Sequence, residues 1–451
     1  MFRSRLAATV ALAMVATLAV AVRPAEADGP LPRIRSDGAN FFYRNAAGER
    51  VAFVPRGLNY IRLGNVPGAE DFHSTFEQNG YSDRDADAML RFMQHSGYNV
   101  VRVFIDPGGP GMHHGIGRSP GEGGLNQAYR SNVEWFIRQA INRGIYVMPV
   151  FDFFPTNAFY DNTYVRKGGR TPTTQASGTN LYYMDPGYIE AKQAYLWYFV
   201  SAMRARLGPA NLTAIFAYEL DNEVFWHASE KPFNTPNVPF TGPNGLPYQM
   251  QDNRQRQRAA DESLDHYAGV VAGTLVGSNG IDPDGMVTMG FATNHLLRRN
   301  GFDGLPGHCT SCDPRVDYRY PGRPANVQSK LTFVDFHVYP RGGAYSIVND
   351  LKSSEVQFLT KPYLIGELGA TKAVYANNIT AAAIDMRNKQ VDSCTVGLGA
   401  KGWLSWTYDS DIVVPHLGHQ DLFYSLLDVN GSGVINGQLA PEARLNPCSI
   451  S

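Results

Sequence analysis

The sequence predicts an α/β protein built on a single (β/α)8 barrel, the fold also called a TIM barrel. Eight short apolar runs follow one another along the 451 residues, and segments with helical periodicity separate most of them. Two of these runs end in acidic residues, as strands of such a barrel do where they present functional groups. One barrel with long loops can account for this length, and we favour it over two domains.

The first 27 residues are expected to be a signal peptide. Two arginines precede an apolar run over 6–22, and Ala25-Glu-Ala27 fits a small-x-small cleavage site. We therefore expect cleavage just before Asp28, secretion, and one catalytic domain with a C-terminal tail over 28–451. An uncleaved membrane anchor is the alternative, since the apolar run approaches the shortest length that spans a bilayer.

Charge and aromatic content narrow the class of partner. With 40 basic and 41 acidic residues the formal net charge is −1, which gives no reason to expect nucleic acid or an anionic membrane as partner. Tyr, Phe and Trp make up 12% of the residues. Such rings can stack on sugars, but most of them are expected to fill a large core.

The barrel is expected to begin behind a β-hairpin on the N-terminal side. Residues 41–53 read as two paired strands that turn at 45–48, and a hairpin in this place commonly plugs the base of a barrel. The first barrel strand follows over 54–59. Asn59 ends that strand on the side where a ligand would bind.

A helix and a strand with a buried charge come next. Ser82 caps a helix that Gly97 ends, and its apolar face consists of Ala86, Met89, Leu90 and Met93. The second strand, over 99–105, carries Arg102 inside an apolar run. Because a buried charge is unfavourable unless it is paired, Arg102 should meet a carboxylate inside the mouth of the barrel.

The remaining elements follow from the same alternation of strand and helix patterns. A glycine-rich loop over 106–125, with His113 and His114, is expected to lie over the active face. Further helices are predicted over 126–143, 185–207, 254–276, 345–353 and 377–390. Further strands are predicted over 145–151, 215–224, 286–291, 331–339, 362–366 and 402–406.

Two long loops on the ligand side carry aromatic residues. The loop over 153–180 contains Phe159, Tyr160 and Tyr164, which are candidates for sugar contacts or for the support of a lid. The insertion over 225–251 is expected to form part of a cleft wall. In it, Trp226 is either a platform on which a sugar stacks or a residue that packs the insertion.

Carboxyl groups end two of the predicted strands. Asn222 and Glu223 close the fourth strand, and Glu367 lies between two glycines at the end of the seventh. Two carboxyl groups so placed are the minimum apparatus for cleaving a glycosidic bond, in which one donates a proton and the other attacks or stabilises the anomeric carbon. Glu219 and Asp221 compete for the acid role, or support it from behind. Weaker candidates are Asp152, Asp335 and Asp409.

Two further strand ends supply polar and aromatic groups. His337 and Tyr339 stand two residues apart on the sixth strand, so both can face the same side of an extended chain. Trp406 ends the eighth strand. We interpret these side chains as parts of the same site.

The four cysteines can pair if the protein is exported to an oxidising compartment. Cys309 and Cys312 form a Cys-Thr-Ser-Cys run, which favours a disulfide between them over half of a zinc site, because no second pair of ligands follows. Cys394 and Cys448 would then tie the C-terminal tail to the barrel. Residues 428–433 resemble the start of a calcium loop, but Leu439 replaces its bidentate Glu, so a hairpin turn is the better reading.

The ordered set of site residues resembles the retaining glycosidases of the large (β/α)8 clan, and most of all glycoside hydrolase family 5. The set consists of Arg102, Asn222, Glu223, His337, Tyr339, Glu367 and Trp406. The runs 218–223 and 336–340 are similar to those of the endo-β-mannanases in this family, which also contains cellulase-like enzymes. The chain differs from the mannanase run at Tyr218, Asp221 and Val224, and a histidine common after the third strand is absent.

The resemblance implies a role for each residue. Glu223 would be the general acid/base and Glu367 the nucleophile, with carboxyl groups about 5 to 5.5 Å apart. Arg102 and Tyr339 would favour the ionised form of Glu367. Asn222 would bind the sugar 2-hydroxyl. Further substrate contacts are expected from His337, Trp406, Asn59 and Trp226. This chemistry requires no metal and no organic cofactor.

We therefore expect a secreted, monomeric, retaining glycoside hydrolase that acts on a polysaccharide or oligosaccharide, of β-mannan or β-glucan type, by double displacement. A transglycosylase would use the same two acids, and a cell-wall arabinan or galactan is an alternative substrate. A non-catalytic glycan-binding barrel belongs to a different class and would be favoured by loss of one acid, yet both are present. The sequence lacks the Gly-x-Ser-x-Gly elbow of serine hydrolases and the His-Glu-x-x-His run of metalloproteases.

Overall fold

The computed structural model describes residues 29–61, 75–78, 80–108, 114–166, 175–299, 318–340, 345–394, 398–408, 423–427 and 433–449. Several predictions made above fall outside these ranges. They are the signal peptide, the Cys309–Cys312 disulfide, the turn at 428–432, and the positions of His113 and Asp409.

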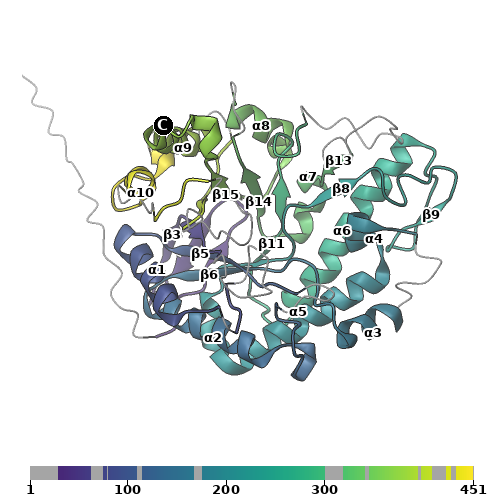
Figure 1. Cartoon of the computed structure of the whole chain (residues 1–451), viewed down its shortest axis with the longest axis horizontal. Coiled ribbons are helices and arrows are strands. Elements are labelled where there is room, and N and C mark those ends of the chain that lie inside the picture. Colours follow the sequence, from purple (N-terminus) through teal and green to yellow (C-terminus); the bar gives the residue numbers. More distant parts are fainter. Residues whose placement is uncertain are drawn as a thin grey trace, which may run out of the picture.

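Parallel strands form a barrel that helices surround (Figure 1). Its strands are β4 (Arg56–Asn59), β5 (Val100–Phe104), β6 (Tyr146–Val150), β7 (Tyr218–Glu219), β11 (Val287–Thr288), β12 (Gly290–Ala292), β14 (Val334–Val338), β15 (Tyr363–Gly369) and β16 (Trp403–Trp406). They pair in the order β11-β7-β6-β5-β4-β16-β15-β14-β12, and every pairing is parallel. This order confirms the predicted α/β barrel.

The fifth predicted strand is divided between β11 and β12, which Met289 separates. β11 pairs with β7 on one side, and β12 pairs with β14 on the other. The nine segments therefore occupy the eight strand positions that the sequence predicts, and the divided strand joins the two ends of the sheet.

The predicted helices are present. They are α1 (Asp83–Ser96), α2 (Gln127–Asn142), α5 (Pro186–Leu207), α6 (Asn253–Leu275), α8 (Ile347–Ser353) and α9 (Ile379–Cys394). Ser82 caps α1 through its hydroxyl, and Gly97 ends it in the left-handed conformation that glycine adopts without strain. Shorter helices are α3 (Ala158–Arg166), α4 (Leu181–Met184), α7 (Pro324–Val327) and α10 (Val434–Leu439).

The N-terminal hairpin is confirmed as well. Strands β1 (Arg35–Ser36), β2 (Phe41–Arg44) and β3 (Arg50–Phe53) form an antiparallel sheet. The ring of Phe41 lies 5.4 Å from that of Phe216 and 5.1 Å from that of Phe333. Because Phe216 and Phe333 precede β7 and β14, the hairpin covers the end of the barrel opposite to the carboxyl ends of its strands.

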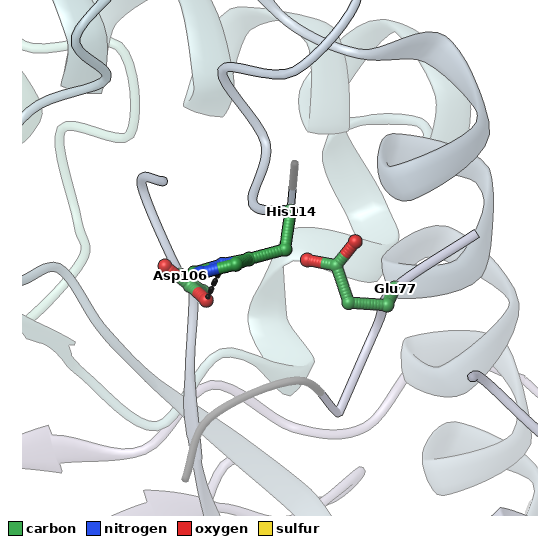
Figure 2. A group of neighbouring side chains, drawn as sticks. All are labelled: Glu77, Asp106 and His114. Carbon is green, nitrogen blue, oxygen red and sulfur yellow. Dashed lines mark hydrogen bonds and ion pairs between the residues drawn. The ribbon is translucent and has the colours of Figure 1, made fainter. Parts of the chain in front are cut away.

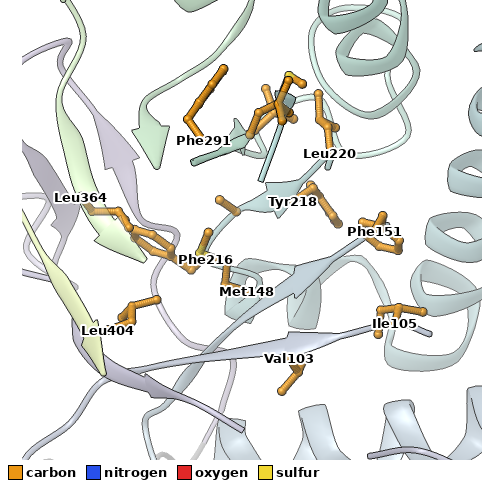
Figure 3. Packing of buried hydrophobic residues seen from close by; sticks show 14 of the residues in the cluster. Val103, Ile105, Met148, Phe151, Phe216, Tyr218, Leu220, Phe291, Leu364 and Leu404 are labelled. Atoms are coloured by element: carbon orange, nitrogen blue, oxygen red, sulfur yellow. The ribbon is translucent and has the colours of Figure 1, made fainter. Parts of the chain in front are cut away.

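Apolar side chains fill the barrel below its carboxyl ends (Figure 3). Met148 of β6, Leu364 of β15 and Leu404 of β16 gather with Phe216, which precedes β7, whereas Val103 points outward to the helices. This alternation is the period of two that strands impose on their side chains. It places Arg102, the neighbour of Val103, on the inner side.

The insertion after the fourth strand takes part in two antiparallel ribbons, one of which it forms with the loop after the fifth strand. β8 (Phe225–His227) pairs with β13 (Arg319–Pro321), and β9 (Phe240–Thr241) pairs with β10 (Pro247–Tyr248). The loop after the third strand contains α3, where Tyr160 and Tyr164 are buried against other aromatic rings. These two tyrosines are therefore core residues, and Phe159 alone of the three is exposed.

A disulfide joins Cys394 to Cys448, as predicted. It holds the C-terminal tail against α9, and Arg56 donates hydrogen bonds to the carbonyl oxygens of Leu439 and Arg444 in the same tail. Within the described residues, no helix has the length and apolar character that crossing a bilayer requires.

Candidate active site

The two predicted catalytic acids meet at the carboxyl ends of the strands. Glu223 follows β7, and Glu367 lies within β15. One carboxyl oxygen of each, together with a ring nitrogen of His337, lie within 4.8 Å of one another. Residues more than 140 positions apart in the chain are therefore brought into one group, because parallel strands present their carboxyl ends on the same side of the barrel.

Arg102 is the hub of the site, and all five of its N–H groups are bonded. Nε and Nη2 donate to the two carboxyl oxygens of Glu219 at 2.6 and 2.7 Å. Nη1 donates to Asn59 at 2.8 Å and to Glu367 at 2.5 Å, and Nη2 also donates to the Asn222 side chain at 2.8 Å. Burial alone would lower the pKa of Arg102, but the carboxylates raise it well above its usual value.

Glu367 is buried among groups that favour its negative charge. Its Oε1 accepts from Arg102, and its Oε2 accepts the phenolic O–H of Tyr339. Burial raises the pKa of the Glu367 carboxyl above its usual value, whereas His337, Arg102 and the bond from Tyr339 act against that rise. The two contacts that the sequence predicted for the ionised form are both present.

Glu223 has a different environment. Its side chain is 33% exposed, and its Oε1 lies 3.3 Å from Nδ1 of His337. Its backbone adopts the left-handed region at φ 48°, which is unfavourable for a residue with a Cβ and is typical of functional turns. The turn directs a partly exposed carboxyl group toward the buried one.

His337 lies between the two acids and a second pair of carboxyl groups. Its Nδ1 is 3.4 Å from Glu367, and its Nε2 is 3.9 Å from both Glu219 and Asp335. Burial lowers the pKa of His337 to about 4, so its ring is neutral at neutral pH. Burial also raises the pKa of Asp335 well above its usual value, which favours a neutral carboxyl group there.

Three further residues were predicted to contact the substrate, and they differ in where they lie. Trp406 ends β16 and packs edge-on against Tyr339 and Phe104. Asn59 is buried and donates to backbone carbonyls of β15 and β16, so it positions Arg102 from below. Trp226 is 1% exposed and packs against Tyr183 of α4 and Phe233, so it is a core residue and offers no face on which a sugar could stack.

The competing acids are engaged elsewhere. Both oxygens of Glu219 bind Arg102, and Asp221 accepts a hydrogen bond from Tyr267. Sequence reasoning did not find that Glu219 is the main partner of Arg102. The signal was its position, because Glu219 lies within the strand, whereas Asp221 and Glu223 follow the end of the strand, and the buried Arg102 requires a carboxylate inside the barrel.

A second cluster lies outside this centre and was not predicted. Glu77, Asp106 and His114 come from three segments and converge (Figure 2). His114 Nδ1 lies 3.0 Å from Asp106 Oδ2, and Glu77 accepts the backbone N–H of Gly115. One atom of each residue lies within 4.8 Å of the others, a spacing that suits a metal ion, as it does around His337. Through these contacts the cluster holds the loop after β5 in place.

This cluster predicts a pH dependence of stability. Burial raises the pKa of Glu77 to about 7. Between pH 4.5 and 7 the unfolded chain releases this proton while the folded protein retains it, so stability falls as the pH rises. Glu77→Gln cannot ionise, and its free energy of unfolding should exceed that of the wild type by about 3 kcal/mol at pH 8 and equal it at pH 4. Urea unfolding at both pH values measures this difference, and Glu122→Gln on an exposed turn is the control. An equal difference at both pH values would contradict the assignment.

Comparisons with known proteins find similarity in structure only. No family model matches the chain, and no curated protein matches it in sequence. An exo-β-1,4-mannosidase from Opitutaceae bacterium strain TAV5 superposes with a TM-score of 0.52 at 17% identity, over 92% of this chain and 62% of that one, so this chain spans less than two thirds of the mannosidase.

Two mannanases also match. The endo-1,4-β-mannanase from Rhizomucor miehei gives a TM-score of 0.52 at 14% identity, over 90% of this chain and 98% of the other. The hyperthermostable endo-1,4-β-D-mannanase from Thermotoga petrophila RKU-1 gives 0.50 at 18% identity, over 87% and 100%. At such identities the likeness concerns the fold, and the chain has the (β/α)8 barrel fold of these solved enzymes.

Proposed function

We propose that the protein is a secreted glycoside hydrolase that cleaves O-glycosidic bonds of a β-mannan or β-glucan type of polysaccharide by a retaining double displacement. The observation that carries this proposal is the pair Glu223 and Glu367, which approach within 4.8 Å at the carboxyl ends of two barrel strands. Retaining enzymes hold their carboxyl groups about 5–5.5 Å apart, and inverting enzymes about 6.5–9.5 Å. The short separation leaves no room for a water molecule between the Glu367 carboxylate and the anomeric carbon, which favours retention.

The first step forms a covalent intermediate. A carboxylate oxygen of Glu367 attacks the anomeric carbon, and the bond from that carbon to the leaving oxygen breaks. The Glu223 carboxyl group gives its proton to the leaving oxygen, so the leaving sugar departs as an alcohol. In the second step, Glu223 takes a proton from water, the resulting hydroxide attacks the anomeric carbon, and Glu367 leaves as a carboxylate.

The contacts of the two acids suit these roles. Glu367 is bonded by Arg102 and Tyr339, two donors that favour a carboxylate able to attack. Glu223 is partly exposed, and its neighbour His337 is neutral. Asn222 lies beside Glu223 on the same turn and would meet the sugar 2-hydroxyl, with Trp406 as the floor of the sugar site.

The substrate class is supported by two lines. The run Tyr218–Glu223 and the run Phe336–Pro340 resemble those of endo-β-mannanases. Three solved enzymes with the same fold are named as a mannosidase or as mannanases. The predicted signal peptide supports secretion.

A panel of polysaccharides tests this proposal. Mature protein is incubated with mannan, β-glucan, xylan, arabinan and galactan, and the products are separated by chromatography. We expect cleavage of mannan or β-glucan, with new reducing ends that have the anomeric configuration of the substrate when proton NMR observes them before mutarotation. The doubly inactivated variant Glu223→Gln/Glu367→Gln is the control. Inverted products would exclude the double displacement, and cleavage by the double variant would exclude both acids.

A further inference from the structure

Two aspartates meet behind the turn that carries Glu223. Asp152 follows β6 and Asp221 follows β7, and their carboxyl groups are hydrogen-bonded to each other. Asp221 is 3% exposed, and Asp152 is partly buried. A carboxylate has no hydrogen to donate, so this bond requires one proton on the pair.

The neighbours of Asp221 prepare it for negative charge. The hydroxyl of Tyr267 donates to its Oδ2 at 2.9 Å, and the backbone N–H of Asn222 donates to its Oδ1 at 3.0 Å. Asp152 receives a longer contact of 3.4 Å from the same N–H. The proton therefore belongs on Asp152, which donates it to the Asp221 carboxylate.

The charge balance agrees with one proton. Lys192 on α5 is buried, and its ammonium donates to the carbonyl oxygens of Phe151 and Phe153 at 2.6 and 2.8 Å, on both sides of Asp152. One ammonium balances one carboxylate, so the second carboxyl group is neutral. Burial raises the pKa of both aspartates; Asp221 raises that of Asp152 further, whereas Lys192 and the bonds from Asp152 and Tyr267 act against the rise at Asp221.

Among the described residues, the helices packed against the pair also bring tyrosines to it. They are Tyr182 and Tyr183 from α4, Tyr188 and Tyr195 from α5, and Tyr267 from α6. Burial raises the pKa of each of them, so they stay neutral over the range in which carboxyl groups titrate. Lys192 is the cation that these described elements bring to the pair.

We propose that Asp152 and Asp221 share one proton and, as positioning residues, hold the turn that presents Asn222 and Glu223. Asn222 is fixed at both ends, because its N–H binds the aspartate pair and its side-chain oxygen accepts from Arg102. Glu223, the next residue, has an unfavourable positive φ, and such a conformation persists only where its surroundings enforce it. The positioning role rests on the proposed function, whereas the shared proton does not.

Melting temperature against pH tests the shared proton without any substrate. The unfolded wild type releases the Asp152 proton near pH 4, but the folded protein retains it, so the wild type loses stability as the pH rises. Asp152→Asn donates the same hydrogen bond and has no proton to lose. Its melting temperature, relative to wild type, should rise by a few degrees from pH 4 to pH 8. Asp284→Asn at an exposed site is the control, with a constant difference.

Kinetics on the cleaved polysaccharide test the positioning role. Asp152→Asn should keep kcat within about threefold of wild type, since the amide retains the bond. Asp152→Ala and Asp221→Asn should lower kcat roughly tenfold to a hundredfold, because the turn shifts. Asp221→Asn also places an amide where Tyr267 and Asn222 require an acceptor.

The outcomes separate this inference from the proposed function. A melting difference between Asp152→Asn and wild type that stays constant from pH 4 to pH 8 would overturn the shared proton. Equal losses of kcat in Asp152→Asn and Asp152→Ala would overturn the positioning role. A wild type that cleaves nothing in the panel sinks the proposed function and the positioning role with it, while the melting comparison still decides the shared proton.

Discussion

Glu367→Ala should lose hydrolysis by roughly a thousandfold or more, because no other group can attack the anomeric carbon from its side. Added azide should restore turnover of an aryl glycoside of the sugar found in the panel. The anion would enter the space that the carboxylate leaves, attack the anomeric carbon once, and displace the leaving group that Glu223 protonates. The product is a glycosyl azide of inverted configuration, which proton NMR identifies.

Glu223→Ala is the matched control for that experiment. An aryl leaving group needs little proton transfer, so Glu367 still forms the covalent intermediate. Azide then attacks from the opposite face and displaces Glu367, which yields a glycosyl azide of retained configuration. The same configuration from both variants would contradict the two roles, and a normal rate for Glu367→Ala without azide would remove Glu367 from the mechanism.

Arg102→Met should destabilise the protein by about 3–5 kcal/mol, since it leaves buried carboxyl groups without their cation. Arg102 is fully buried and bonded through all five N–H groups, so no water replaces the lost donors. The acidic limb of kcat/KM should also move to higher pH, because Arg102 acts to lower the pKa of Glu367. Urea unfolding and a pH–rate profile measure the two effects.

Two further variants sharpen that test. Adding Glu219→Gln to Arg102→Met removes one of the stranded charges and should recover part of the lost stability. Arg138→Met breaks a half-exposed pair on α2 and should cost within about 1 kcal/mol. Equal destabilisation by Arg102→Met and Arg138→Met would show that the buried network stabilises the protein no more than a surface ion pair does.

The sequence predicts those parts of the site in which a single residue is physically unusual for its place in the chain. A charge inside an apolar strand demands a partner, and Arg102 has one in Glu219 and another in Glu367. Asn222–Glu223 and Glu367 were found because a carboxyl group at a strand end is unusual in a packed core. The hairpin and the capped helix α1 follow from local signals of turn and cap.

Contacts between segments that are distant in the chain could not be predicted from the sequence. β8 and β13 are some ninety residues apart, and neither run has enough strand character to indicate its partner. Asp152 and Asp221 were candidates for the acid role in the sequence, and only the fold shows that they meet each other. Trp226 has a large ring on which a sugar could stack, but Tyr183 and Phe233 pack around it and bury it. For Tyr160 and Tyr164 the sequence left sugar contact and support of a lid open, and their burial against other rings decides against sugar contact.

The divided fifth strand also bears on how molecules of this protein meet each other. A strand with an unpaired edge is a template onto which another chain can add. In the described barrel, β11 offers its edge to β7 and β12 offers its edge to β14, so the ring presents no such template between them. Each half is also bonded to the other neighbour, because the N–H of Thr332 donates to the carbonyl oxygen of Val287 and the N–H of Val224 donates to that of Gly290. The divided strand therefore leaves no free edge at this position of the described barrel, and a second copy of the chain would have to displace an existing neighbour in order to pair there.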